Sequence, residues 1–242
     1  MPKFFIGVTL FLVFSCSSKN NNGSPEQPEN KFTYQDSMDI PLDPQPLQDI
    51  PPTTNTNFDV LVRKYEDPSR TEWQNPELVL EKLGNLDGKT VADLGAGSGY
   101  FTFRMAQTAE KIIAIDIDPR FLSYIEERKK EFPENLADKI VSRLTAEDNP
   151  SLQKNEVDVV LLVNTFHYIQ NRSEYFKKVK NGLKNNGFLV IVDVKNPNAP
   201  LGPPEDLIVG LEIAFAELRE AGFREFSIDE NSLEYQYIMI AR

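Results

Sequence analysis

The sequence contains a single cysteine, Cys16, and it lies near the N-terminus. A domain formed by the later residues therefore has no thiol for a disulfide bond or a catalytic nucleophile. The sequence also lacks a basic stripe: its formal net charge is −11, and acidic residues are spread along its 242 residues. A surface of this charge repels phosphate, so we expect no nucleic acid among the partners. No convincing cluster of metal-ligating side chains is present, and no metal is predicted.

Long apolar runs are scarce as well. One mostly apolar run, residues 4–14, follows Lys3 but is too short to span a bilayer comfortably. A basic start, an apolar run and a small residue, Ser15, before Cys16 together predict a signal peptide over residues 1–15. The sequence Val13-Phe14-Ser15-Cys16 resembles a bacterial lipobox. This resemblance implies that Cys16 is lipidated and anchors the chain to a membrane of the bacterial cell envelope, in the periplasm or at the outer membrane. An ordinary signal peptide and an uncleaved anchor are the alternatives.

Residues 16–57 have the composition of a tether. Seven of the seventeen prolines lie between residues 17 and 57, separated mainly by polar side chains without an apolar period. Such a segment cannot bury enough apolar surface to fold, so we expect a disordered Pro/Asn-rich linker. Residues 58–242 have the composition of one globular domain.

Within residues 58–242, apolar segments that are typical of buried strands alternate with amphipathic helical segments. This alternation predicts an α/β fold with a doubly wound, mostly parallel seven-stranded sheet. The last two strands have no helix between them, which predicts an antiparallel hairpin at the edge of the sheet. The expected strands are 90–94, 111–115, 140–144, 157–163, 188–194, 223–228 and 234–241, and the expected helices include 119–131, 172–183 and 205–221.

A glycine-rich turn follows the first strand, in the sequence Thr90-Val-Ala-Asp-Leu-Gly-Ala-Gly-Ser-Gly-Tyr-Phe-Thr102. Gly95, Gly97 and Gly99 allow a tight turn and a close approach of a ligand to the backbone. The helix that follows presents free N–H groups and a positive dipole end. The turn therefore predicts a nucleotide or nucleoside site, and its G-x-G-x-G spacing differs from the G-x-G-x-x-G of dinucleotide enzymes.

Asp93 and this glycine spacing resemble the first motif of class I S-adenosylmethionine-dependent methyltransferases. The resemblance extends over about residues 60–242 and implies a Rossmann-like fold with a reversed terminal strand. It also implies that S-adenosyl-L-methionine is the cofactor and that Asp93, Gly95 and Gly97 contribute to its binding.

Asp116 ends the second strand, 21 residues after Gly95. A doubly wound fold places a carboxylate there against ribose hydroxyls. The resemblance implies that Asp116 binds the ribose and that Ile117 packs on the adenine. Asp118 is the competing acid, but its place before Pro119 is more typical of a helix cap.

Polar residues also follow the third and fourth strands. By resemblance, Glu147 or Asp148 lies near the adenine amino group; the sequence leaves the choice open. Asn164 holds the amino-acid end of the cofactor or lines the acceptor site. His167, the only histidine, is a candidate general base or acceptor ligand, with a purely structural role as the alternative. Trp73 in the lead-in is a candidate lid residue or a packing residue.

The sequence therefore predicts a membrane-tethered methyltransferase with an unidentified acceptor. It lacks the Asn/Asp-Pro-Pro-Tyr/Phe motif of enzymes that methylate exocyclic amines of bases, which leaves small organic, lipid-like or protein acceptors. The alternative is a non-catalytic S-adenosylmethionine- or nucleoside-binding or scaffold lipoprotein of the same fold. A nicotinamide-dependent oxidoreductase is disfavoured by the glycine spacing. The oligomeric state is not predicted.

Overall fold

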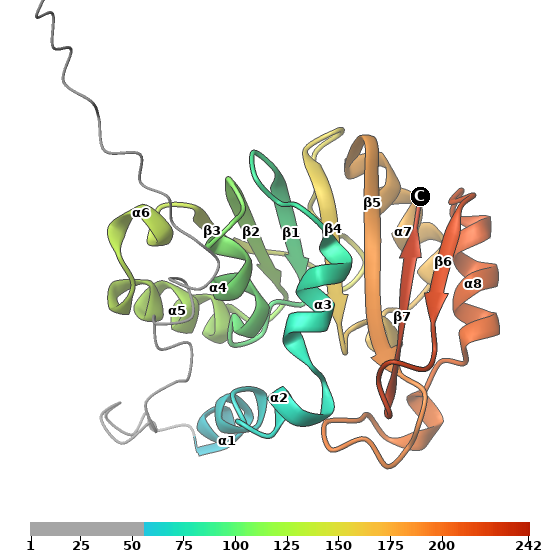
Figure 1. Ribbon diagram of the computed structural model, residues 1–242, viewed down its shortest axis with the longest axis horizontal. Helices are drawn as coiled ribbons and strands as arrows, with labels where there is room; N and C mark the ends of the chain where they lie inside the picture. Colours follow the sequence, from blue (N-terminus) through green and yellow to red (C-terminus); the bar gives the residue numbers. More distant parts are fainter. Residues whose placement is uncertain (1–55) are drawn as a thin grey trace, which may run out of the picture.

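The computed structural model describes residues 56–242 (Figure 1). Within them the chain forms one seven-stranded sheet in the order β3-β2-β1-β4-β5-β7-β6. Its strands are β1 (Thr90–Leu94), β2 (Lys111–Asp116), β3 (Ile140–Leu144), β4 (Val157–Val163), β5 (Leu183–Val194), β6 (Phe226–Asp229) and β7 (Gln236–Ala241).

The strand directions confirm the predicted α/β class. Strands β1 to β5 are parallel, and β7 is antiparallel to both of its neighbours. The predicted antiparallel pair of terminal strands is confirmed, and it lies at the edge of the sheet. The last strand, β7, lies inside the sheet between β5 and β6, so that β6 forms the edge.

Helices cover both faces of the sheet, as Figure 1 shows. On one face, α3, α4 and α5 pack on a core that includes Val79, Phe103 and Ile125. On the other face, α7 and α8 pack on a core that includes Phe176 and Leu218. The segments on the two faces are α3 (Pro76–Leu83), α4 (Tyr100–Ala106), α5 (Pro119–Arg128), η2 (Lys129–Glu131), α6 (Glu134–Ala137), α7 (Arg172–Gly182) and α8 (Leu211–Glu220).

The helix predicted over 205–221 is wrong in its first half. A single 3-10 turn, η4 (Glu205–Leu207), is followed by a break, and α8 begins only at Leu211. Gly210 caps α8 with an extended backbone, φ −61° and ψ 146°, which a continuous helix cannot contain.

The lead-in lies at the end of the sheet where the parallel strands have their carboxyl ends (Figure 1). It comprises α1 (Thr56–Tyr65) and α2 (Arg70–Trp73). Phe58 and Val62 of α1 pack on Phe121 of α5 in a small apolar cluster of their own. Next to this cluster, Arg128 and Glu66 form a buried ion pair with a 3.0 Å separation. The first helix of the lead-in, α1, is therefore packed on α5.

The predicted signal peptide, Cys16 and most of the predicted tether lie outside the described residues. The boundary predicted at 57/58 falls inside α1, which begins at Thr56. Among residues 56–242, no helix has the length and apolar character that crossing a bilayer requires.

Candidate active site

A cleft of about 660 Å³ opens at the carboxyl ends of β1, β2 and β4. In the strand order, β1 is the point from which the chain moves outward in both directions, and ligands of doubly wound folds bind at such a switch point. The walls come from segments 93–98, 115–118, 145–147 and 163–170, with α1 and Arg70 closing one side.

The glycine turn forms the floor of the cleft. Gly95 has φ 82° and Gly97 has φ 53°, backbone angles that residues other than glycine rarely adopt. A Cβ atom on Gly95 would lie 2.3 Å from Oγ1 of Thr165, and one on Gly97 would lie 3.2 Å from the ring of Tyr65. The turn is therefore a cradle in which the backbone itself faces the cleft.

Asp116 lies buried beside this turn. Its Oδ2 accepts the N–H of Gly97 at 2.8 Å, and its Oδ1 accepts the N–H of Asp118 at 2.9 Å. Burial raises the pKa of Asp116, and these backbone N–H groups act in the opposite direction. Each carboxylate oxygen keeps a further lone pair, so Asp116 can accept two more donors, such as vicinal hydroxyls.

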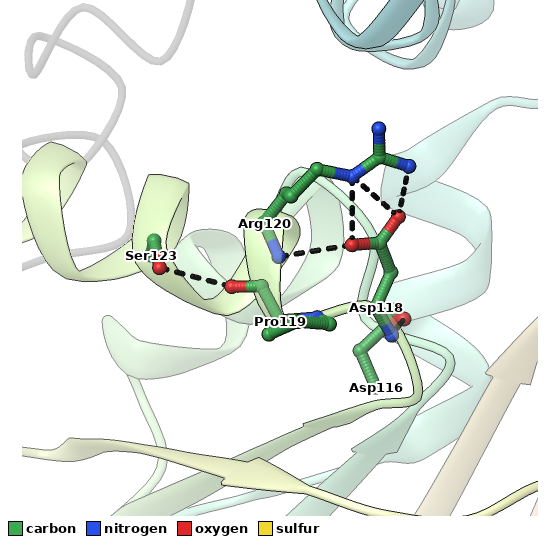
Figure 2. Close-up of polar contacts among 5 residues, drawn as sticks. All are labelled: Asp116, Asp118, Pro119, Arg120 and Ser123. Atoms are coloured by element: carbon green, nitrogen blue, oxygen red, sulfur yellow. Dashed lines mark hydrogen bonds and ion pairs between the residues drawn. The ribbon is translucent and has the colours of Figure 1, made fainter.

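Asp118 is held by its own helix. Its carboxylate accepts the backbone N–H of Arg120 at 2.9 Å and forms an ion pair with the Arg120 guanidinium at 2.6 Å. Figure 2 shows this carboxylate turned toward Arg120, with Pro119 at the start of α5. Ile117, between the two acids, lines the cleft and is largely exposed. Asp118 therefore acts as the helix cap, which leaves Asp116 as the free acid of this strand end.

Asp93 lies at the end of β1 and is almost completely buried. Its Oδ2 accepts a hydrogen bond from the Thr102 hydroxyl at 2.6 Å. Burial raises the pKa of Asp93 to about 6, and the Thr102 hydroxyl opposes this shift. The carboxylate thus stays ionised at neutral pH at the cost of stability, which is typical of a functional position.

The loop after β3 separates the two acids that the sequence left as alternatives. Glu147 lines the cleft together with Thr145 and Ala146. Asp148 is not among the lining residues, and its carbonyl oxygen accepts a hydrogen bond from Lys178 at 2.7 Å. The structure therefore brings Glu147, and not Asp148, to the site.

His167 follows β4 and is paired with an acid at the end of β5. Its Nδ1 lies 2.6 Å from Oδ1 of Asp193, and both side chains are almost inaccessible to solvent. Asp193 Oδ1 also accepts the N–H of Val194 at 2.7 Å. Because an ionised carboxylate only accepts hydrogen bonds, Nδ1 is the donor to Asp193, and in a neutral ring of this tautomer Nε2 keeps its lone pair. His167 also lines the cleft.

Asn164 follows β4 directly, with φ 55°, and lines the cleft. Its Oδ1 accepts a hydrogen bond from Nε2 of Gln236 at 2.6 Å. Its Nδ2 is buried and makes no hydrogen bond. The Asn164 Nδ2 group is therefore a donor without a partner among the described residues.

Three contributors to this site were not found from the sequence. Arg70 is buried against the cleft, with its guanidinium 3.7 Å from the ring centroid of Tyr100, and Tyr65 of α1 covers the glycine turn. Gln236 reaches Asn164 from β7. The four-residue spacing of Arg70 and Gln74 on one helix face was a usable signal for the lead-in. Trp73, the predicted lid candidate, is half-buried and does not line the cleft.

Comparison with known proteins agrees with this geometry. Residues 92–191 match a family described as a methyltransferase domain. A demethylmenaquinone methyltransferase of Tropheryma whipplei is 32% identical over 121 residues, which cover 50% of this chain and 48% of that protein. A tRNA U34 carboxymethyltransferase of Aeromonas hydrophila is 30% identical over 125 residues, covering 50% of this chain and 38% of that protein. The matches thus span about half or less of the length of these relatives.

A solved structure extends the similarity to the whole domain. The S-adenosylmethionine-dependent methyltransferase of Aquifex aeolicus superimposes with a TM-score of 0.68 at 25% identity, covering 77% of this chain and 98% of that one. Residues 92–191 thus match a methyltransferase domain family, and the described part of the chain has the same fold as an S-adenosylmethionine-dependent methyltransferase.

Proposed function

We propose that this protein is an active S-adenosylmethionine-dependent methyltransferase that is tethered to a membrane through Cys16. The observation that carries the catalytic part is the shared cleft: the glycine turn, Asp116 and His167 all line it. A nucleoside cradle and a histidine with a free ring nitrogen are thus available to one bound pair of reactants.

The residues present fit the cofactor. The cradle at Gly95 and Gly97 has no room for side chains, and the paired oxygens of Asp116 suit vicinal ribose hydroxyls. Ile117 offers an exposed apolar surface for the adenine, and Glu147 offers a carboxylate for its amino group. When bound, S-adenosylmethionine supplies a methyl group activated by the sulfonium.

His167 is proposed as the general base for the methyl acceptor. Asp193 holds Nδ1 at 2.6 Å and thereby fixes the ring orientation and the tautomer. The free Nε2 can then take the proton from an O–H or N–H group of the acceptor as that atom becomes nucleophilic. Histidine suits this role because its ordinary pKa lies near neutrality.

The acceptor is proposed to be a small, largely apolar or lipid-like molecule with an ionisable O–H or N–H. The residues that line the cleft include Tyr168, Ile169, Tyr175 and Leu201. These side chains favour an apolar body, whereas the net charge of −11 disfavours a polyphosphate such as nucleic acid. The alternative acceptor is a protein whose methylated residue lies in an apolar segment. Envelope proteins are therefore included in the methyl-transfer assay.

Calorimetry of the full chain with S-adenosylhomocysteine tests the cofactor, and transfer of labelled methyl groups to a lipid extract, to small phenols and to envelope proteins tests the activity. Heat of binding with transfer to one of these pools is expected. Binding without any transfer supports the alternative of a non-catalytic binding protein, and absence of binding contradicts both readings.

The tether is tested in cells. The wild-type protein is expected in the membrane fraction and is expected to incorporate a labelled fatty acid, whereas Cys16→Ala is expected to do neither. A conservative exchange at another small residue near the N-terminus, Ser18→Ala, serves as the control. Wild-type protein in the soluble fraction, without label, contradicts the tether and leaves the catalytic proposal intact.

A further inference from the structure

Apolar side chains are exposed around the mouth of the cleft. Val60 of α1, Leu144 at the end of β3 and Tyr168 after β4 are 54%, 56% and 57% exposed. Tyr168 lines the cleft, and Val60 and Leu144 directly precede the lining residues Leu61 and Thr145. Single exposed apolar residues are common on protein surfaces, but three that border one opening indicate a contact surface. We call Val60, Leu144 and Tyr168 the apolar rim.

The apolar rim has members on both sides of the mouth. Leu144 is on the same face of β3 as Ile140, which packs in the core beneath α5, and Val60 belongs to α1, which packs on α5. Tyr168 instead follows Phe166, which packs in the core beneath α7. Ile117 is also exposed in the cleft, but the adenine covers it in the proposed function and it is not counted in the rim.

The exposed face of α1 adds basic side chains to the rim. Val60, Arg63 and Lys64 are all exposed and are three or four residues apart, so they share one face of the helix. Phe58 and Val62 cover another side of the helix and pack on α5. Apolar and basic side chains together are typical of helices that lie in the interface of a bilayer, where Lys and Arg meet anionic head groups.

The proposed tether joins the domain at this same place. Thr56 begins α1, which lies at the cleft end of the sheet (Figure 1), and it follows Cys16 by 40 residues. A coil of this length has a root-mean-square reach of roughly 35 Å. A domain of this size has a radius of gyration of about 16 Å, so an anchor at Cys16 alone does not fix which side faces the bilayer. It does make α1 the element that is held nearest to it.

The tether also determines how strong the contact with the bilayer has to be. The net charge of −11 repels an anionic bilayer, so the basic face of α1 is not expected to recruit an untethered domain. A flexible tether raises the effective concentration of the surface to about the millimolar range, where a weak contact suffices. Because salt screens charges beyond about 8–10 Å, Arg63 and Lys64 count more at contact than acids elsewhere on the domain.

We propose that the mouth of the cleft faces the bilayer to which Cys16 is anchored, with the apolar rim in the bilayer interface and with Arg63 and Lys64 at the lipid phosphate groups. An apolar acceptor then passes from the bilayer into the cleft, toward His167, without crossing water. This inference rests on the proposed function, and in particular on the tether.

Quenching by nitroxide lipids measures which end of the domain faces the bilayer. The lipid-anchored full chain is placed in vesicles of phosphatidylcholine and phosphatidylglycerol that contain a doxyl-labelled phosphatidylcholine. A fluorophore is attached to a new thiol at the rim, in Val60→Cys or Leu144→Cys, or at the far end of β2, in Glu110→Cys. Glu110 is exposed and precedes β2, whose other end is Asp116 in the cleft, so about 20 Å of strand separates the two ends.

We expect the fluorescence at positions 60 and 144 to fall about twofold or more and that at position 110 to change by less than about a tenth, since an interfacial helix enters the bilayer by only about 5–10 Å. Leu144→Asp, in the chain labelled at position 60, is expected to restore about half or more of the lost fluorescence, because it places a charge in the rim. Thr108→Asp, at an exposed residue near Glu110, is the matched control and is expected to restore none. Circular dichroism and calorimetry with S-adenosylhomocysteine check that each variant is folded.

Equal quenching at the three positions, stronger quenching at position 110, or no quenching in protein that floats with the vesicles overturns the inference while the proposed function stands. Protein that carries no lipid and does not float with the vesicles overturns the tether and the inference together. Binding of S-adenosylhomocysteine in the same preparation tests the methyltransferase part of the proposed function separately.

Discussion

Replacing Asp93 by asparagine is expected to stabilise the ligand-free protein at neutral pH. Asp93 is buried at the end of β1, where burial raises the pKa of its carboxyl from about 3.8 to about 6. Above pH 6 the folded protein must therefore keep an ionised group that the unfolded chain ionises more easily. An amide of the same shape avoids this cost and can still bond with the Thr102 hydroxyl.

The magnitude follows from the two pKa values. At about 1.36 kcal/mol per pKa unit, the rise corresponds to about 3 kcal/mol. Because the folded pKa is the higher one, the stability contributed by Asp93 is complete below about pH 3.8 and is lost as the pH rises through 6. Between pH 5 and pH 7.5 the advantage of Asp93→Asn over the wild type is expected to grow by roughly 1.4 kcal/mol.

Urea denaturation at pH 5.0 and at pH 7.5, without ligand, measures the difference in free energy of unfolding. Asp87→Asn, at an exposed acid, is the matched control. The reasoning is refuted if Asp93→Asn is less stable than the wild type at pH 7.5, or if its advantage does not grow between the two pH values. A stabilised variant that also binds S-adenosylhomocysteine more weakly would identify Asp93 as a site kept at the expense of stability.

Three further variants test other parts of the site. Asp193→Asn is expected to lower methyl transfer at least about 100-fold with unchanged S-adenosylhomocysteine affinity, because His167 loses the acceptor that fixes its tautomer; turnover near that of the wild type contradicts the base role. Asp116→Ala is expected to weaken both S-adenosylhomocysteine and 5′-methylthioadenosine about tenfold or more in calorimetry, since both carry ribose hydroxyls; a loss for only one of them argues against ribose binding. Glu66→Gln is expected to cost about 3–5 kcal/mol of unfolding free energy, because buried Arg128 loses its partner; an unchanged urea midpoint contradicts this.

The central strands of the sheet could be predicted well because buried parallel strands are mostly apolar, and the edge strand β3 was predicted although only its first residue is buried. The segments 90–94, 140–144 and 157–163 coincide with β1, β3 and β4. The glycine turn could also be predicted from the sequence, because all of its residues are close together in the chain. The break before α8 could not be predicted, because a single glycine such as Gly210 is also tolerated inside a helical pattern.

The position of β7 and the hydrogen bonds that join Gln74, Gln236 and Asn164 could not be predicted, because both depend on contacts between distant parts of the chain. Gln74 and Gln236 are 162 residues apart, and Gln236 and Asn164 are 72 residues apart. A glutamine at the start of an apolar strand carries no local sign of its partner. The sequence could not decide between Glu147 and Asp148 either, because the direction in which each loop side chain points depends on the folded backbone.

The attachment of α1 has a consequence for exchange of ligand with solvent. Phe58 and Val62 hold α1 on α5 through a cluster that is separate from the cores on the two faces of the sheet. Leu61 and Tyr65 of the same helix form part of the cleft wall. Sub-global opening of this one helix therefore uncovers the cleft while both cores stay intact, and its free energy is smaller than that of global unfolding. Amide hydrogen exchange in residues 58–65 is therefore expected to report on opening of this cleft wall separately from unfolding of the sheet.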